Sequence, residues 1–314
     1  MELPASAAQC PQDGTVPLQD IGIIAVTGPD ASKYLQGQLT IDVNRLDLNS
    51  ARFGAHCDFK GKSWAVFLCL THGEGFLLMT PRSGLDGSLA ELKKYGVFSQ
   101  VEIEDASDQW QVLGLFGEGP LHAAAEQFGT LSEQHLGVCR QDNGIAVTLQ
   151  SPQQRALVLL PAGHSGFAVP QPQLRAVWEM MDIQSGIANI QQATSNAFVP
   201  QMLNVQAIDG IDFDKGCYMG QEVVARTKYL GKNKRAAFVL CGEQASDLAP
   251  GDNLEMQAGD NWRRAGTALR VATLGQQTWC LAVLPNDLEQ GALLRSKEQP
   301  EAVFTVQPLP YSLE

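Results

Sequence analysis

The sequence predicts an α+β protein in which mixed α/β domains precede a C-terminal antiparallel β-barrel. Up to about residue 230, apolar strand-like segments are mixed with amphipathic helical segments. After residue 235 no helical period is evident, and short strand-like runs alternate with turn residues such as Pro250-Gly251. We expect four regions, which are a flexible leader at 1–20, an α/β body at 21–110 plus 170–232, a second α/β domain at 111–169, and the barrel at 236–314.

The element boundaries follow from apolar patterns and turn residues. Residues 21–26 are apolar and β-branched and stop at Gly28-Pro29, and Asp30 can cap the helix that follows. The turn at residues 71–73 predicts a hairpin between the strands on either side of it. The expected strands are 21–26, 63–70, 76–80, 101–103, 111–116, 145–148, 156–160, 236–241, 265–273 and 278–283, and the expected helices follow Asp30 or cover 85–95, 121–128 and 174–186.

The charge balance limits the kinds of partner. The chain has 22 Lys and Arg residues against 34 Asp and Glu residues, which gives a net charge of −12. A broad nucleic-acid-binding surface needs clustered cations, so the composition argues against one but leaves a local basic patch open. No apolar run approaches the roughly 18–20 residues that span a bilayer, and residues 1–20 contain no Lys, no Arg and no long apolar stretch. We expect a cytoplasmic monomer without membrane contact.

Seven cysteines are spread along the chain without a C-x-x-C pair. They are Cys10, Cys57, Cys69, Cys139, Cys217, Cys241 and Cys280. This spacing provides no zinc knuckle and no self-contained iron–sulfur motif, so we expect no metal site built by this chain alone. Scattered free thiols are typical of a reducing compartment, and we expect most of them to be small buried hydrophobic residues.

The most unusual part of the chain is the segment at 209–235. Gly216 and Gly220 bracket Cys217, and glycines this close predict a tight turn or a close backbone approach. Two features would lower the pKa of the Cys217 thiol, namely the charge of Lys215 and the N-terminus of a helix expected to follow the second glycine. A thiolate there could be a nucleophile, a redox sensor or one ligand of a metal cluster. The alternative is a small turn residue beside a buried tyrosine.

Five cations follow within ten residues, with no acidic residue among them. They are Arg226, Lys228, Lys232, Lys234 and Arg235. In a chain of net charge −12, this run predicts an anion patch for phosphate or carboxylate groups. The alternative is a solvated loop that leads into the barrel.

The octapeptide at 215–222 resembles the signature K-G-C-Y-x-G-Q-E of the YgfZ family. Its matching positions are Lys215, Gly216, Cys217, Tyr218, Gly220, Gln221 and Glu222. Further segments resemble motifs of the same family, namely 34–38, 57–62, 91–95 and 308–314. The resemblance covers nearly the whole chain beyond residue 20.

This resemblance implies a fold related to the aminomethyltransferase of the glycine cleavage system, with the domains arranged around a central hole that holds tetrahydrofolate. It implies a folate-binding accessory protein that is needed for modification of some tRNAs, such as methylthiolation, through maintenance of iron–sulfur enzymes. Folate would be the cofactor, and iron–sulfur tRNA-modifying enzymes would be indirect or transient partners. The anion patch would receive tRNA phosphates or the glutamate tail of folate, although the net charge makes direct tRNA binding the weaker expectation.

Three residues carry the site that the resemblance implies. The family's cysteine falls on Cys217. A folate-contacting tryptophan falls on Trp178, whose indole face suits stacking on a pterin, and whose alternative role is a core anchor of an amphipathic helix. A second folate-contacting position falls on Ile21, which offers an apolar wall but no stacking.

Two other functions stay open. One is a tetrahydrofolate-dependent one-carbon transferase, with Cys217 or Asp58 as the chemical group. The other is a scaffold that shares an iron–sulfur cluster between Cys217 and the thiols of a partner. The related aminomethyltransferases carry an acidic pair after a glycine turn, and residues 63–65 occupy that place here without a carboxylate. Because this general base is missing, we expect a binding protein rather than an enzyme of amine transfer.

Overall fold

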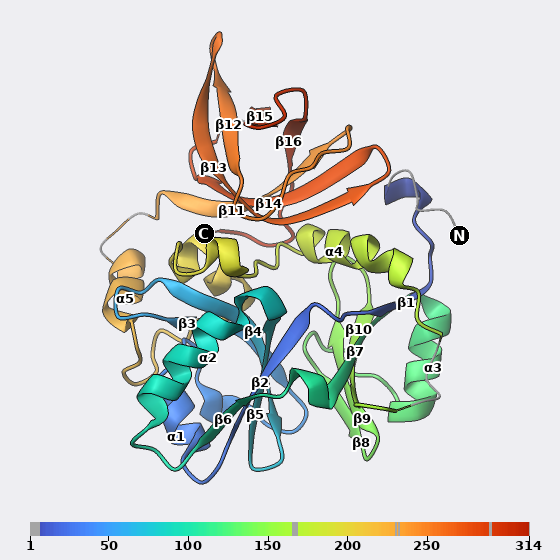
Figure 1. The fold of residues 1–314 in the computed structure, drawn as a ribbon, viewed down its shortest axis with the longest axis vertical. Coiled ribbons are helices and arrows are strands. Elements are labelled where there is room, and N and C mark those ends of the chain that lie inside the picture. Colours follow the sequence, from blue (N-terminus) through green and yellow to red (C-terminus); the bar gives the residue numbers. More distant parts are fainter. Residues whose placement is uncertain (1–6, 165–168, 230, 232, 289–290, 314) are drawn as a thin grey trace.

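The computed structural model describes residues 7–164, 169–229, 231, 233–288 and 291–313. It contains two five-stranded antiparallel sheets and a closed six-stranded barrel. Figure 1 shows the barrel above the two sheets, with helix α4 (Arg175–Gln184) between them. In this part of the chain, no helix is both long and apolar enough to cross a membrane.

The first sheet has the strand order β3-β4-β5-β2-β6. Successive residues of its strands face two different cores, as the pleat of a strand requires. Ile24 and Val26 pack under α1 (Ala31–Gln36) and α2 (Arg82–Gly96), whereas Ile23 and Ala25 face the centre of the molecule. The strands are β2 (Ile21–Thr27), β3 (Ala51–Cys57), β4 (Ser63–His72), β5 (Gly75–Pro81) and β6 (Glu102–Asp105).

The second sheet has the strand order β1-β7-β10-β9-β8, and α3 (Glu118–Phe128) packs on its outer face. The expected flexible leader at 1–20 is wrong for residues 14–20. Residues 14–17 form β1, which pairs with β7, and Val16 and Leu18 are buried in the central core. The strands are β1 (Gly14–Pro17), β7 (Trp110–Phe116), β8 (Val138–Gln141), β9 (Gly144–Leu149) and β10 (Arg155–Pro161).

The C-terminal barrel closes in the order β11-β14-β13-β12-β15-β16, and its final strand pairs with its first. The prediction of a C-terminal antiparallel barrel is therefore confirmed. In Figure 1 the hairpin of β12 and β13 projects from the end of the molecule that lies farthest from the sheets. The strands are β11 (Arg235–Gly242), β12 (Asn253–Ala258), β13 (Asn261–Leu274), β14 (Gln277–Pro285), β15 (Leu293–Ser296) and β16 (Val303–Gln307).

One hydrophobic core joins the three parts of the molecule. It contains Ile23 of the first sheet, Val147 of the second sheet and Leu281 of the barrel, with Val177 and Ile183 of α4 between them. Because α4 lies between layers, it buries side chains on several sides rather than along one narrow stripe. This position places the polar groups of α4 at the junction of all three parts.

Candidate functional site

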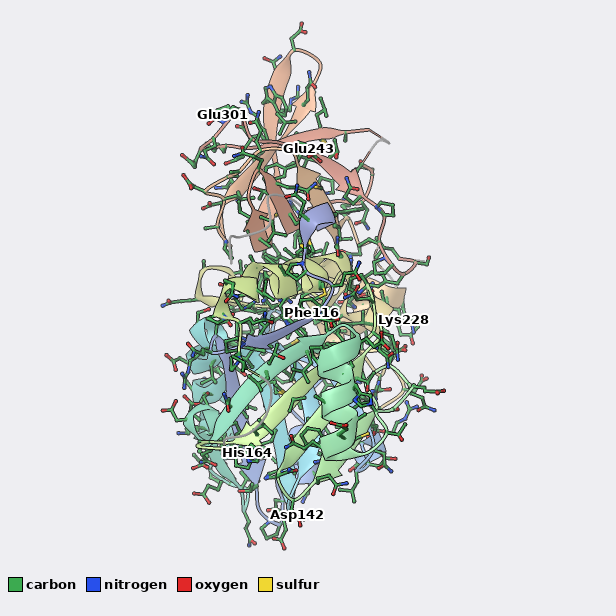
Figure 2. The ribbon with its side chains drawn as sticks, turned by 90° about the vertical axis from the view of Figure 1, so that its right-hand side faces the viewer. Phe116, Asp142, His164, Lys228, Glu243 and Glu301 are labelled. Carbon is green, nitrogen blue, oxygen red and sulfur yellow. The ribbon has the colours of Figure 1, made fainter. Side chains whose placement is uncertain are left out.

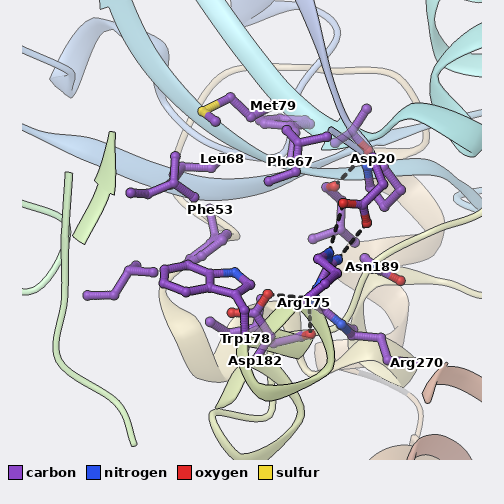
Figure 3. Close-up of a pocket in the computed structure, with 18 residues that line it drawn as sticks. Asp20, Phe53, Phe67, Leu68, Met79, Arg175, Trp178, Asp182, Asn189 and Arg270 are labelled. Carbon is purple, nitrogen blue, oxygen red and sulfur yellow. Dashed lines mark hydrogen bonds and ion pairs between the residues drawn. The ribbon is translucent and has the colours of Figure 1, made fainter. Parts of the chain in front are cut away.

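A pocket lies where the two sheets meet α4 (Figure 3). Ile21 stands at the start of β2 and Trp178 in α4, and the fold brings these two predicted folate contacts to the same pocket. They are 157 residues apart in the sequence, and their contact with folate stays a prediction. The apolar lining residues are Ile21, Phe53, Val66, Phe67, Leu68, Met79, Leu149, Leu157, Trp178 and Ile187.

The Trp178 indole is tightly held at the edge of this pocket. Only 1% of the residue is exposed. A Cβ atom at Gly114 of β7 would lie 2.4 Å from Cε3 of the indole, so only glycine fits there. The guanidinium of Arg155 lies 4.6 Å from the centroid of the indole ring. Figure 3 shows the indole nitrogen directed towards the pocket. Trp178 is thus both a core residue and a pocket wall.

The polar side of the pocket begins with ion pairs at the start of α4. Arg175 donates hydrogen bonds to the two carboxylate oxygens of Asp20 at 2.8 and 2.5 Å, and to Glu179 one turn along the helix at 2.9 Å. Burial raises the pKa of Asp20, but the hydrogen bond and the charge of Arg175 outweigh it, so the pKa is lowered overall. Asp20 is therefore held in its ionised form beside Ile21.

Two buried arginines from other parts of the chain continue this network. Arg270 of β13 donates to Glu179 at 2.6 and 2.9 Å and to Asp182 at 2.6 Å. Arg155 of β10 pairs with the same Asp182 at 2.7 Å. Burial raises the pKa of Asp182, but the charges of Arg270 and Arg155 lower it overall. The network thus links the barrel and the second sheet to α4 at the wall of the pocket.

Sequence reasoning missed this network completely. Its members come from four separate segments of the chain, and the i, i+4 spacing of Arg175 and Glu179 is the single local signal of it. The missed residues are Asp20, Arg155, Arg175, Glu179, Asp182 and Arg270.

The pocket also presents polar atoms that lack a partner within the described protein. Nη1 of Arg175, a donor, and Oδ1 of Asn189, an acceptor, are both buried and make no hydrogen bond, and both residues line the pocket. Such groups are costly unless something pairs with them. An apolar cavity with a tryptophan wall, one free donor and one free acceptor suits a flat heterocycle that carries hydrogen-bonding groups. The residues present therefore fit a pterin.

The carboxylates of the pocket are poorly suited to act as general bases. Asp20 and Asp182 are the acidic residues that line it, and each is paired with an arginine that lowers its pKa. Asp58, the alternative considered from the sequence, does not line the pocket. Its carboxylate instead accepts hydrogen bonds from the backbone N–H groups of Lys60 and Lys62 at 2.9 and 2.8 Å and so caps the β3–β4 turn.

The motif at 215–222 forms a separate region, because none of its residues lines the pocket. Lys215 is directed inward, and its ammonium donates to the backbone carbonyls of Gln36, Leu39 and Ile41 at 2.8, 2.7 and 2.6 Å. Burial lowers the pKa of Lys215 to about 8. The Lys215 ammonium is therefore hydrogen-bonded to the connection between α1 and β3. It is not directed at the Cys217 thiol, on which the sequence predicts that its charge acts.

The two glycines of the motif differ in what surrounds them. Gly220 has a φ of +80°, and a Cβ atom there would lie 2.5 Å from the carbonyl oxygen of Asp58 in the β3–β4 turn. The expected close backbone approach is therefore confirmed at Gly220. A Cβ atom at Gly216 would meet nothing within 4 Å, so the expectation fails there. The expected helix follows directly as α5 (Gln221–Tyr229).

Cys217 is exposed in the loop before α5, whereas the neighbouring Tyr218 is buried. The other cysteines are buried or half-buried, as expected for most of them. Cys217 is thus the thiol that a macromolecular partner can reach. Among the residues that the structure describes, no group of three or more His, Cys, Asp or Glu side chains could hold a metal ion.

The predicted anion patch is divided between α5 and the barrel. On α5, Arg226 pairs with Glu222 at 2.8 Å, and the ammonium of Lys228 lies 3.7 Å from the centroid of the Phe213 ring. These two cations therefore already have partners in the chain. Lys232 lies outside the described residues.

The other two cations of the run belong to the barrel. Lys234 is exposed just before β11. Arg235, the first residue of β11, donates to the backbone carbonyl of Ala265 at 2.6 Å. Its guanidinium is thus anchored to a nearby part of β13, and an anion site at the described cations of the run stays a prediction.

Comparison with solved structures identifies the class of protein that this fold and pocket define. The glycine cleavage system aminomethyltransferase T from Bartonella henselae matches with a TM-score of 0.71, covering 95% of this chain and 86% of that chain. The sequence identity is 15%, so the match shows an aminomethyltransferase-like fold and nothing finer. The expected fold class is confirmed.

Sequence comparisons then identify the particular family. A family model described as the YgfZ β-barrel domain matches residues 233–299. The tRNA-modifying protein YgfZ of Yersinia enterocolitica is 41% identical over 305 residues, covering 95% of this chain and 92% of the relative. The protein of the same name from Cronobacter sakazakii is 40% identical over 319 residues, covering 99% and 96%. The chain belongs to the YgfZ family.

Proposed function

We propose that this chain is a cytoplasmic folate-binding accessory protein that supports tRNA modification, including methylthiolation, by maintaining iron–sulfur enzymes. The observation that carries the folate part is the pocket, which joins Trp178 and Ile21 to unpartnered polar atoms of Arg175 and Asn189. The tRNA part rests on the relatives, which are named as tRNA-modifying proteins. The two parts are tested separately below.

In this proposal the pocket binds and orients the pterin end of tetrahydrofolate. Trp178 and the apolar walls would cover the ring and exclude water, while Nη1 of Arg175 would donate to it and Oδ1 of Asn189 would accept from it. Tetrahydrofolate, when bound, supplies a carrier for one-carbon units. Because the two pocket carboxylates are paired with arginines, this chain provides holding and orientation rather than an obvious proton acceptor.

The folate proposal is tested by titrating the protein with tetrahydrofolate under reducing conditions and measuring binding by calorimetry. We expect saturable binding, which Trp178→Phe weakens by roughly two- to tenfold because the larger indole surface is lost. The matched control is Trp110→Phe. Trp110 of the second sheet is half-buried against His72 of the first sheet, and it does not line the pocket. No saturable binding to the wild type, or equal losses in both variants, would contradict a pterin site at Trp178.

The tRNA proposal is tested at Cys217 in cells that lack the endogenous protein. Because this thiol is exposed, Cys217→Ala should leave the protein folded and at normal abundance but abolish its support of tRNA methylthiolation. Modified nucleosides are quantified by mass spectrometry of digested tRNA. Cys139→Ala, which removes a half-buried thiol of the second sheet, is the control and should preserve modification. Full modification with Cys217→Ala would exclude an essential thiol.

A shared iron–sulfur cluster is the second candidate role for this region, favoured by the exposure of Cys217. One accessible thiolate can complete a cluster only if a partner supplies the remaining ligands. The expected outcome is that an iron–sulfur enzyme loses its cluster more slowly under air when the wild type is present than when Cys217→Ala is present. Equal rates of cluster loss would remove this candidate and leave the folate proposal untouched.

A further inference from the structure

One outer face of the barrel gathers cations around an aromatic side chain. This barrel cation face consists of Arg235, Trp262, Arg264 and Arg295. Three cations on one face stand out in a chain whose net charge is −12. Trp262 and Arg264 lie on the β12–β13 hairpin, which projects away from the rest of the molecule in Figure 1.

Strand register places the hairpin part of this face. Glu255 of β12 is opposite Arg264 on one side and opposite Arg295 on the other, so the three side chains share one face of the sheet. Trp262 precedes Arg264 by two residues and therefore points to the same face. The guanidinium of Arg295 lies 4.3 Å from the centroid of the Trp262 ring. The half-exposed indole is thus held beside cations.

The single carboxylate that the register places among these cations is already neutralised. Glu255 accepts two hydrogen bonds from Arg295, at 2.9 and 2.7 Å. Arg235 and Arg264 form no ion pair within the described residues. They therefore place positive charge without an ion-pair partner on β11 and β13, on either side of β14.

Arg235 reaches from the start of β11 to β13. Its Nη2 donates to the carbonyl oxygens of Ala265 and Val283, at 2.6 and 3.4 Å, which fixes the guanidinium at the edge of β13. Burial and the nearby charge of Arg264 lower the pKa of Arg235. The two arginines are thus near enough for their charges to repel one another, and a bound anion would relieve this repulsion.

We infer that the barrel cation face binds single-stranded RNA. Phosphates would contact Arg264 and Arg235, and an unpaired base would stack on Trp262. A small anion would contact one or two of the cations and would not contact the Trp262 indole. A single RNA strand alternates phosphates with flat bases, so it can contact both the cations and the indole. The inference is independent of the folate pocket, because RNA binding by a protein that fails to bind folate would leave it intact.

The test uses a fluorescein-labelled single-stranded oligouridine and an RNA duplex of the same length, with the full chain and fluorescence anisotropy at low and moderate salt. Arg264→Glu should weaken single-strand binding by about tenfold and make the salt dependence shallower by about 0.7 per lost phosphate contact. Arg263→Glu is the matched control. It makes the same charge change one residue earlier, on the opposite face of the hairpin, and should stay within about twofold of the wild type.

Trp262→Ala tests the stacking part of the inference. The oligouridine should bind roughly tenfold more weakly, while the duplex, whose bases are already stacked, should change little. Circular dichroism of each variant checks that the barrel remains folded. No binding of oligouridine at low salt, equal losses for Arg263→Glu and Arg264→Glu, or equal losses of single strand and duplex with Trp262→Ala would each overturn the inference.

Discussion

The central pocket and the motif loop at 215–222 are built in opposite ways. The pocket takes its polar wall from distant segments, from Asp20 near one end of the chain to Arg270 in the barrel, and it surrounds them with apolar side chains. The motif loop is one continuous segment that exposes Cys217 at the surface. The pocket therefore depends on the packing of distant parts of the chain against one another, whereas the loop exposes its thiol within one continuous segment.

The two regions also use charge differently. In the pocket, Arg270 faces two carboxylates at 2.6 Å, and over the whole network three arginines balance three carboxylates. In the loop, Lys215 is surrounded by backbone carbonyls, which are dipoles rather than charges. Removing one member of the pocket network leaves an unpaired charge, and this difference predicts a hierarchy of mutational effects.

The largest effect is expected for Arg270→Ala. This change leaves Glu179 and Asp182 buried without their main partner, and we expect it to reduce the free energy of unfolding by about 3–5 kcal/mol. Urea denaturation followed by circular dichroism measures it. Arg226→Ala, which removes an exposed arginine paired with Glu222, is the control and should change stability by about 0.5 kcal/mol or less. Similar losses in the two variants would erase the distinction between the regions.

Acid should act on the pocket network through Asp182. Its pKa is lowered in the folded state below the ordinary value of an aspartate, so the folded protein releases this proton more readily than the unfolded chain. The stabilisation is fully present above the unfolded pKa and is lost as the pH falls through the folded pKa. Urea midpoints measured from neutral pH down to strongly acidic pH should fall, and Asp182→Asn should make that fall shallower. An unchanged pH profile in Asp182→Asn would show that other carboxylates control acid unfolding.

An intermediate effect is expected within the motif itself. Gly220→Ala forces a left-handed backbone on alanine and puts its Cβ atom against the carbonyl of Asp58, which should cost about 1–3 kcal/mol. Gly216→Ala places a methyl group in open space and should change stability by about 0.5 kcal/mol or less. Thermal and urea denaturation of the pair compare the two positions directly. Equal stability of the two variants would mean that the motif loop does not need its contact with the β3–β4 turn.

The smallest effect on stability is expected for Cys217→Ala. Because the thiol is exposed, the free energy of unfolding should stay within about 0.5 kcal/mol of the wild type. The same denaturation assay measures it, and thiol labelling of the wild type under native conditions should modify Cys217 well before Cys69 or Cys280, which are buried. A large loss of stability, or simultaneous labelling of the buried thiols, would show that the loop is more than an exposed platform.

The secondary structure shows where local patterns were sufficient. The hairpin of β4 and β5 was predicted from a turn between two apolar runs, and the structure pairs these strands in antiparallel register. Strand β3 was missed because Arg52, Gly54 and His56 interrupt its apolar pattern, although the strand is almost entirely buried. Strand β1 was missed because Gly14–Pro17 is short and is stabilised by its pairing with β7 rather than by its own composition.

The amino-acid sequence by itself determined the α+β class, the C-terminal barrel, the helix after the motif, and the resemblance that singled out Cys217, Trp178 and Ile21. These are local or contiguous features, and periodicity and motif spacing encode them directly. The tertiary structure alone decided that Trp178 and Ile21 share a pocket, that an alternating ion network lines it, and that Lys215 is directed away from Cys217. It also brought Arg235 of the basic run close to Arg264. Such arrangements arise because the packing of the two sheets, α4 and the barrel brings side chains together that are far apart in the sequence. A local sequence pattern contains no information about these distances.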